Sequence, residues 1–172
     1  MTNEDDSYPS TKQRESWIRH SYRLAEAAVA AGNHPFGACI VIDGEIVLEA
    51  ENTVHTDKDP TRHAEMNVLH AASRLSEEQI SKAILVTSTE PCAMCSGGLY
   101  WTGIKTMIYG CSAKELDRIA GPSLKCHSHE VFEGAVKPPI VFGPILEGEG
   151  SQQHEDYWPK LRTEGGGKQP HE

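Results

Sequence analysis

One dipeptide, Asp43-Gly44, constrains the fold of this chain more than any other feature of its sequence. It separates two apolar runs in the stretch "FGACIVIDGEIVLEAEN". Asp-Gly flanked by apolar runs is the strongest short-range signal for a β-hairpin. The sequence therefore predicts two paired strands, over residues 37–42 and 45–51.

Helical and strand-like segments alternate around this hairpin. Apolar residues at helical spacing predict a helix over residues 11–31, which Gly32 ends. Further helices are expected after Pro60, directly after Pro91, over 113–120 and over 151–162, and further strands at 83–88, 105–111 and in "PIVFGP". Residues 121–139 are rich in Gly, Pro, His and Ser and are predicted to form a loop. Strands joined through helices indicate an α/β fold with a mixed sheet.

The length and composition fit a single domain of ordinary size. A chain of 172 residues suits one domain, expected over residues 11–162, with disordered tails at 1–10 and 163–172. No apolar run is long enough to predict a membrane span. The first residues, "MTNEDDSYPS", are acidic and polar, so a cytoplasmic location is expected. A net charge of −9 favours a small-molecule partner over a nucleic acid, although a local basic groove stays open.

The five cysteines include one CxxC pair, Cys92 and Cys95. An odd number without a regular framework argues against a disulfide scaffold. The pair could be a redox motif, part of a metal site or two buried thiols. Cys39 and Cys111 lie in or at the end of apolar runs and are expected to be buried.

A second motif upstream favours the metal site. The segments "HAE" (residues 63–65) and "PCAMC" (residues 91–95) each occupy a turn from strand or loop into helix. If both helices pack on one face of the sheet, their N-termini converge and bring His63, Cys92 and Cys95 together. Three protein ligands with a fourth position open are the pattern of a catalytic zinc site. Helix N-termini also favour the thiolate form that binds metal.

Glu65 lies two residues beyond His63 and is predicted to act as a proton carrier. It is close enough to hydrogen-bond a metal-bound water without being a ligand. From there it could take a proton from that water and deliver it to a substrate nitrogen.

The segments "PFGACIVIDGEIV", "DPTRHAEMNVLHAA" and "STEPCAMCSGGLYW" together resemble the zinc-dependent cytidine and nucleobase deaminase superfamily. The resemblance covers residues 15–115 and is strongest to the branch with guanine, cytosine and tRNA adenosine deaminases. It implies a three-layer α/β/α fold with about five central strands. It also implies Zn²⁺ held by His63, Cys92 and Cys95, Glu65 as the catalytic proton shuttle, and hydrolytic release of ammonia from a ring.

The resemblance also implies contacts to the substrate. Asn52 matches a residue that hydrogen-bonds the ring, the backbone N–H of Ala64 matches a contact to a substrate oxygen, and Phe36 matches an aromatic pocket wall. In "DYWPKL", Tyr157 or Trp158 is a candidate lid aromatic that stacks on the ring; the alternative is a helix that packs on the core. Members of the family are commonly homodimers, so a homodimer is expected.

Guanine, converted to xanthine and ammonia, is the first predicted substrate, because "GGLYWTG" and "DPTRHAE" look most like guanine deaminases. Cytosine is the second. A tRNA adenosine deaminase and a catalytically silent binding subunit are the alternatives, and the intact set with Glu65 speaks against the silent one. After residue 112 the chain departs from the guanine deaminase pattern.

Two further expectations concern other parts of the chain. Trp101 is expected to be a core aromatic. The run Cys126-His127-Ser128-His129 could supply a fourth ligand or a second metal site, and a polar loop is the simpler interpretation.

Overall fold

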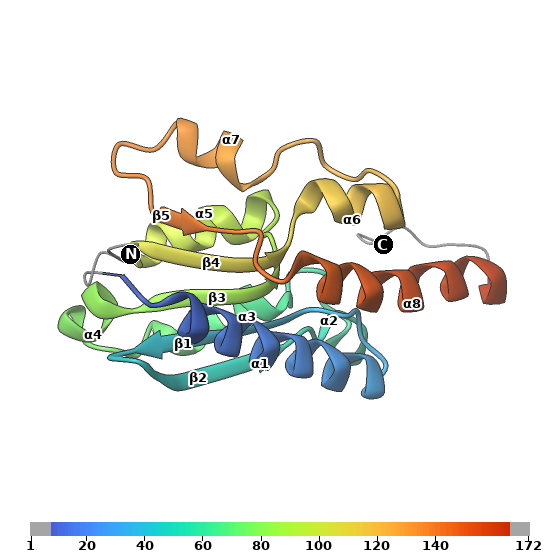
Figure 1. Ribbon diagram of the computed structural model, residues 1–172, viewed down its shortest axis with the longest axis horizontal. Helices are drawn as coiled ribbons and strands as arrows, with labels where there is room; N and C mark the ends of the chain where they lie inside the picture. Colours follow the sequence, from blue (N-terminus) through green and yellow to red (C-terminus); the bar gives the residue numbers. More distant parts are fainter. Residues whose placement is uncertain (1–7, 166–172) are drawn as a thin grey trace.

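The computed structural model describes residues 8–165, and these residues contain a five-stranded sheet in the order β2-β1-β3-β4-β5 (Figure 1). Strand β1 is antiparallel to both of its neighbours, whereas β3, β4 and β5 run parallel to one another. The mixed five-stranded sheet confirms the predicted fold class. The strands are β1 (Gly37–Ile42), β2 (Glu45–Glu51), β3 (Ile84–Thr89), β4 (Thr106–Cys111) and β5 (Ile140–Phe142).

The predicted hairpin has the bounds that the sequence indicated. Asp43 and Gly44 both have positive φ, 50° and 87°, as the tight turn of a two-residue hairpin requires. A register irregularity between Ile40 and Val41 interrupts the ladder with β2. The turn chemistry therefore fixes where β1 ends and β2 begins.

Eight helices surround the sheet in the described residues. Residues 121–139 were expected to form a loop, but they contain a helix, α7, whose Phe132 is buried in the core. The last helix begins at Glu147, before the predicted start, and runs to Gly165. Disordered tails were predicted at 1–10 and 163–172; residues 1–7 and 166–172 lie outside the described residues, and 163–165 belong to α8 instead. The helices are α1 (Thr11–Ala30), α2 (Val54–Asp57), α3 (Ala64–Ala72), α4 (Glu77–Lys82), α5 (Ala93–Thr102), α6 (Ala113–Ala120), α7 (Ser128–Glu133) and α8 (Glu147–Gly165).

Strand β1 is buried on both faces and divides the core into two layers. Its alternate residues Ala38, Ile40 and Ile42 pack with buried residues of α3, α5 and α7. The intervening Cys39 and Val41 pack with α1 on the opposite face. Side chains of a strand point alternately to opposite faces, so this pattern requires a helical layer on each side of the sheet. The arrangement is the predicted three-layer α/β/α fold.

The expectation that Trp101 belongs to the core is wrong. Its side chain is 84% exposed, because the buried face of α5 is formed instead by Cys95, Ser96 and Leu99. Cys39 and Cys111 are buried, as predicted. None of the helices in the described residues is long and apolar enough to cross a membrane.

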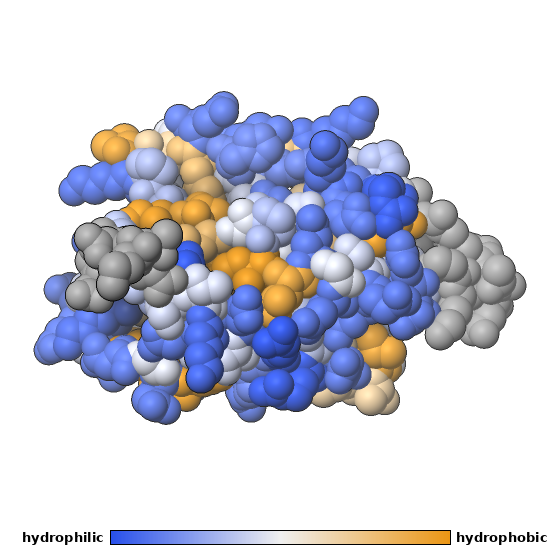
Figure 2. All heavy atoms as spheres, in the orientation of Figure 1, coloured by the Kyte–Doolittle hydropathy of each residue, from blue (hydrophilic) through white to orange (hydrophobic). Residues whose placement is uncertain are grey.

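Helix α1 lies close against the start of β1 because Gly37 has no side chain. A Cβ at this position would collide with the backbone of Ser21 and Ala25 and with the side chain of Leu24. The outer face of the molecule on the α1 side is largely hydrophilic, with a band of hydrophobic residues across its middle (Figure 2). Because Gly37 allows this close approach, α1 packs directly on the sheet.

We expect Gly37→Ala to lower the free energy of unfolding by about 1–3 kcal/mol, the usual cost of overpacking a core. Gly148→Ala is the matched control, because a Cβ there meets nothing within 4 Å. Urea unfolding followed by circular dichroism measures both. Equal stability of Gly37→Ala and the original chain would contradict the close contact.

Candidate metal centre

Segments from four parts of the chain meet at one end of the sheet. Antiparallel pairing places Gly37 opposite Glu51 and Ala38 opposite Thr87, so β1 begins where β2 and β3 end. The side-chain amide of Asn67 in α3 donates a hydrogen bond of 2.9 Å to the carbonyl of Glu51. This bond ties the beginning of α3 to the same end of the sheet.

His63, Cys92 and Cys95 come together at that end, as the sequence predicted. His63 is the N-cap of α3 and Cys92 is the N-cap of α5, so both helix N-termini face the cluster. The Nδ1 atom of His63 lies 3.7 Å from Sγ of Cys92 and 3.6 Å from Sγ of Cys95. Their ligand atoms form a group that could hold a metal ion.

The spacing and chemistry of this group fit zinc. Tetrahedral bonds of zinc to one nitrogen and one sulfur place these two atoms about 3.6 Å apart, close to both observed separations. Two thiols and one imidazole are the soft and borderline donors that zinc prefers. The group supplies three protein ligands, which leaves one tetrahedral position for another molecule.

The surroundings favour a thiolate at Cys92. A hydrogen bond from Cys95 is the main cause that lowers the pKa of Cys92 to about 4, and His63 lowers it further. The same bond, together with burial, raises the pKa of Cys95 well above its ordinary value. Burial alone would lower the pKa of His63, but its hydrogen bond to Cys92 and the charges of Glu65 and Cys92 outweigh that and raise it. Cys92 and each of the other two groups therefore shift one another's pKa, and the thiolate form is favoured at Cys92.

Glu65 lies in the first turn of α3 and is 5% exposed. Burial raises the pKa of its carboxyl to about 7, although the nearby His63 opposes the shift. A carboxyl group with a pKa near neutrality can both accept and donate a proton at physiological pH. The structure therefore places an acid–base group beside the three candidate ligands.

The predicted substrate contacts Asn52, Ala64 and Phe36 lie at the same end of the sheet. The backbone N–H of Asn52 donates to the carbonyl of Phe36 at 3.0 Å, which joins the residue after β2 to the residue before β1. The side-chain oxygen of Asn52 accepts from the N–H of Val54 at 3.1 Å. Ala64 is the first residue of α3, where backbone N–H groups lack partners within the helix.

Tyr157 and Trp158 belong to an aromatic cluster between α6 and α8. Trp158 is 3% exposed and packs with Ile119 and Ala120, with Phe36 partly buried against the same cluster. The hydroxyl of Tyr157 lies 3.1 Å from Nδ1 of His34. The structure therefore joins the C-terminal aromatics to Phe36, and it buries Trp158 more deeply than Tyr157.

His154 anchors this cluster to β3, a contact that sequence reasoning missed. The indole N–H of Trp158 can only donate, so the Nδ1 atom of His154, 3.2 Å away, accepts. Nε2 of the neutral ring then carries the proton and donates to the hydroxyl of Thr89 at 2.8 Å. Thr89 ends β3, three residues before Cys92. The only sequence signal was the four-residue spacing of His154 and Trp158, which places them on one helix face.

Glu90 makes a second set of contacts that sequence reasoning missed. One of its carboxylate oxygens accepts from the backbone N–H of Ala113 at 3.0 Å, and the other accepts from the hydroxyl of Ser128. Its own N–H donates to the carbonyl of Cys111 at 2.8 Å. The residue two positions before Cys92 therefore holds the first residues of both α6 and α7.

Within the described residues, the structure does not support the expectation that residues 126–129 supply a fourth ligand to the His63 site. The group that contains His63 includes no ligand atom from this segment. His127 and His129 form a separate group with Glu130.

Comparison with known proteins gives one family and several kinds of deaminase. The family model for the cytidine and deoxycytidylate deaminase zinc-binding region matches residues 11–111. A probable cytosine deaminase from Schizosaccharomyces pombe is 35% identical over 150 residues, covering 83% of this chain and 91% of the relative. Guanine deaminase from Bacillus subtilis is 43% identical over 97 residues, covering 55% and 62%. A tRNA-specific adenosine deaminase from Aquifex aeolicus is 37% identical over 103 residues, covering 59% and 68%.

Solved structures agree with the fold. A guanine deaminase structure from Nitrosomonas europaea superposes with a TM-score of 0.71 at 21% identity, covering 84% of each chain, which establishes the shared fold. The guanine deaminase structure from Bacillus subtilis has a TM-score of 0.58 at 30% identity, covering 90% of this chain and 97% of the other.

We expect the buried His154 to make stability depend on pH. Burial lowers its pKa to about 4, against about 6.5 in an unfolded chain, although Glu115 partly opposes the shift. The neutral ring therefore contributes stability that is complete above pH 6.5 and is lost as the pH falls towards 4. Between pH 7 and pH 4 the free energy of unfolding should fall by up to about 3 kcal/mol more in the original chain than in His154→Gln.

Urea unfolding at several pH values measures this difference. Glutamine can keep a hydrogen bond to Thr89 but does not titrate, and other titrating groups cancel between the two chains. Parallel pH profiles would show that His154 is not held neutral.

Proposed function

The chain belongs to the zinc-binding cytidine and deoxycytidylate deaminase family, and from this premise we propose that it is a zinc-dependent hydrolytic deaminase of a free nucleobase. The observation that carries the proposal is the meeting of His63, Cys92 and Cys95 at two helix N-termini beside the buried Glu65. A merely structural zinc site would need a fourth protein ligand and would have no use for a buried carboxyl group alongside.

In this proposal His63, Cys92 and Cys95 hold the zinc ion. When bound, zinc supplies Lewis acidity that makes hydroxide available at neutral pH. Glu65 moves both protons: its carboxylate accepts one from the attacking water and delivers it to the substrate ring nitrogen. It then accepts the second from the new hydroxyl group on the ring carbon and delivers it to the departing amine. Ammonia leaves, and a carbonyl replaces the amino group, so the water oxygen and both its protons are accounted for.

We assign the remaining predicted contacts to the substrate pocket. Asn52 would hydrogen-bond the ring, the N–H of Ala64 would bind a ring oxygen, and Phe36 would form a wall. The near-complete burial of Trp158 favours a role in supporting Phe36 from behind. The half-buried Tyr157, at the outer side of the same cluster, is then the better candidate to close over the ring.

Guanine is our first candidate substrate and cytosine the second. The 43% identity to a guanine deaminase over the central part of the chain supports guanine. The similarity to a probable cytosine deaminase supports cytosine, because it extends over 83% of the chain and so includes much of the C-terminal third. That third supplies Tyr157 and Trp158.

The net charge of −9 supports a free base over tRNA, since RNA binding depends on basic side chains that neutralise phosphates. The intact set of His63, Glu65, Cys92 and Cys95 supports an active enzyme over a silent subunit. A cytoplasmic location remains a prediction from the polar and acidic first residues.

We expect Glu65→Gln to keep the fold and about one tightly bound zinc per chain but to lose ammonia release by about 10²–10⁴-fold, the usual contribution of a positioned acid–base group. Glu45→Gln, on the exposed hairpin, is the control and should keep full activity. Metal analysis after passage over a chelating resin and an ammonia assay give both quantities. Near-normal turnover in Glu65→Gln would overturn the proton-transfer role.

A screen of ammonia release identifies the substrate. Guanine, cytosine, adenine, their nucleosides, pterins and triazines are compared at equal concentrations, with a tRNA stem-loop as the macromolecular substrate. We expect turnover of a free base that changes little with salt, because a small neutral ring releases no counterions. Turnover of the stem-loop alone, with strong salt dependence, would instead identify a tRNA deaminase.

We also propose that the chain forms a homodimer. Met94 and Trp101 are exposed and lie seven residues apart, on one face of α5, where they leave apolar surface in contact with water. Sedimentation velocity should show a dimer that Trp101→Lys dissociates. A monomeric original chain would contradict the proposal.

A further inference from the structure

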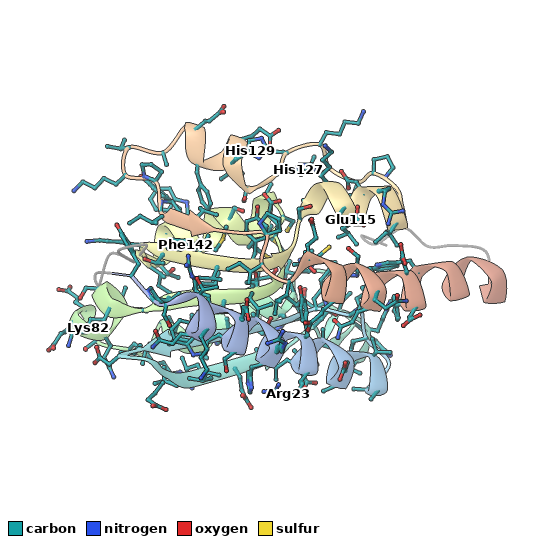
Figure 3. The ribbon with its side chains drawn as sticks, viewed as in Figure 1. Arg23, Lys82, Glu115, His127, His129 and Phe142 are labelled. Atoms are coloured by element: carbon teal, nitrogen blue, oxygen red, sulfur yellow. The ribbon has the colours of Figure 1, made fainter. Side chains whose placement is uncertain are left out.

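Two imidazoles and a carboxylate come together where the chain enters α7. One ring nitrogen of His127, one of His129 and a carboxylate oxygen of Glu130 lie within 4.8 Å of one another. Nε2 of His129 is 3.4 Å from Oε1 of Glu130, and the centroids of the two imidazole rings are 6.1 Å apart. Figure 3 shows both histidines at α7, on the outer side of the molecule away from α1. From this cluster we propose a second metal site that binds a divalent transition metal reversibly.

The donors define the class of metal. Imidazole nitrogen with a carboxylate suits Zn²⁺, Ni²⁺ or Cu²⁺, whereas Mg²⁺ and Ca²⁺ prefer oxygen ligands alone. Around zinc, neighbouring nitrogen and oxygen ligands are about 3.3 Å apart. The observed separations therefore need only a small side-chain movement, and the His129 side chain, which is 64% exposed, is free to make it.

A carboxylate from another element supports His127. Oδ2 of Asp117, in α6, lies 3.1 Å from Nε2 of His127. A carboxylate on the second nitrogen of a ligating histidine fixes the ring and increases its basicity. Among the described residues, no carboxylate outside α7 holds His129 in this way.

Glu130 is oriented by its own helix. Its Oε2 accepts from the backbone N–H of His127 at 2.6 Å, so Oε1 remains directed to His129. The side chain of His127 also accepts from the backbone N–H of Glu130. A metal bond at that nitrogen would replace this hydrogen bond, which makes the site weaker than the His63 site and its metal exchangeable.

The second site is connected to the candidate metal centre through Ser128. This residue lies between the two histidines, and its hydroxyl donates to Glu90, two positions before Cys92. On the inner side of α7, Phe132 is buried in the core that α5 shares. Metal at the second site would therefore stabilise the start of α7, and with it residues 121–139, beside the turn that carries Cys92.

The test is a zinc titration of the full chain after a chelating resin has removed weakly held metal. We expect the original chain to take up one additional equivalent, and His129→Ala to take up none. Asp117→Asn should weaken the additional equivalent by about 10- to 100-fold. His70→Ala, which removes an exposed histidine of α3, is the matched control and should bind like the original chain.

Two readouts distinguish this site from the cysteine site. Cobalt at the second site should give no sulfur-to-metal charge-transfer band, because the proposed ligands contain no thiolate. Added zinc should slow hydrogen exchange in residues 121–139 of the original chain and His70→Ala, but not of His129→Ala.

No additional equivalent in the original chain, or an undiminished one in His129→Ala, would overturn the proposal. His129 is outside the proposed catalytic machinery, so ammonia release by His129→Ala should be unchanged. Because stoichiometry is the readout, failure of the deaminase proposal would leave this test intact.

Discussion

The position of β1 between β2 and β3, antiparallel to both, is the constraint on which the rest of the structure depends. This pairing sets the start of β1 against the ends of its two neighbours. Phe36, Asn52 and Cys92, which are far apart in sequence, thereby gather at one end of the sheet. Helix α5 begins shortly after the end of β3, and Asn67 holds the start of α3 to the end of β2, so this register brings the two helix N-termini together. A shift of this register by one residue would turn the β1 side chains that pack with α3, α5 and α7 toward α1, and those that pack with α1 to the opposite face.

Local chemistry made much of the fold predictable. Asp43-Gly44 can form its turn in few ways, so the hairpin followed from two residues. Helix α7 was missed because its six residues have no strong local preference, and contacts with distant residues, such as Ser128 with Glu90, hold it. Trp101 was misplaced for a related reason. An aromatic residue usually gains by burial, and only the way α5 rests on the sheet determines which of its faces is solvent-exposed.

The candidate site also contains parts that local sequence predicts and parts that depend on distant contacts. The cluster of His63, Cys92 and Cys95 was predictable because each motif sits at a helix start, and helix starts meet at one end of an α/β sheet. The contacts of the C-terminal aromatics were not, because they depend on how α8 crosses α6. His154 shows this well: its two hydrogen bonds reach Trp158 within the helix and Thr89 in β3. No periodicity in the sequence specifies the second partner.

The two edge strands of the sheet, β2 and β5, affect how copies of the molecule can associate. Strand β5 has only three residues, and β2 presents Glu45 and Glu49 to solvent. Short and charged edges are poor templates for the addition of another strand. Growth of the sheet from chain to chain, the route to fibres, is therefore disfavoured at both margins. Copies of the chain that associate in an orderly way would then have to meet through the helical layers, as in the dimer proposed through α5.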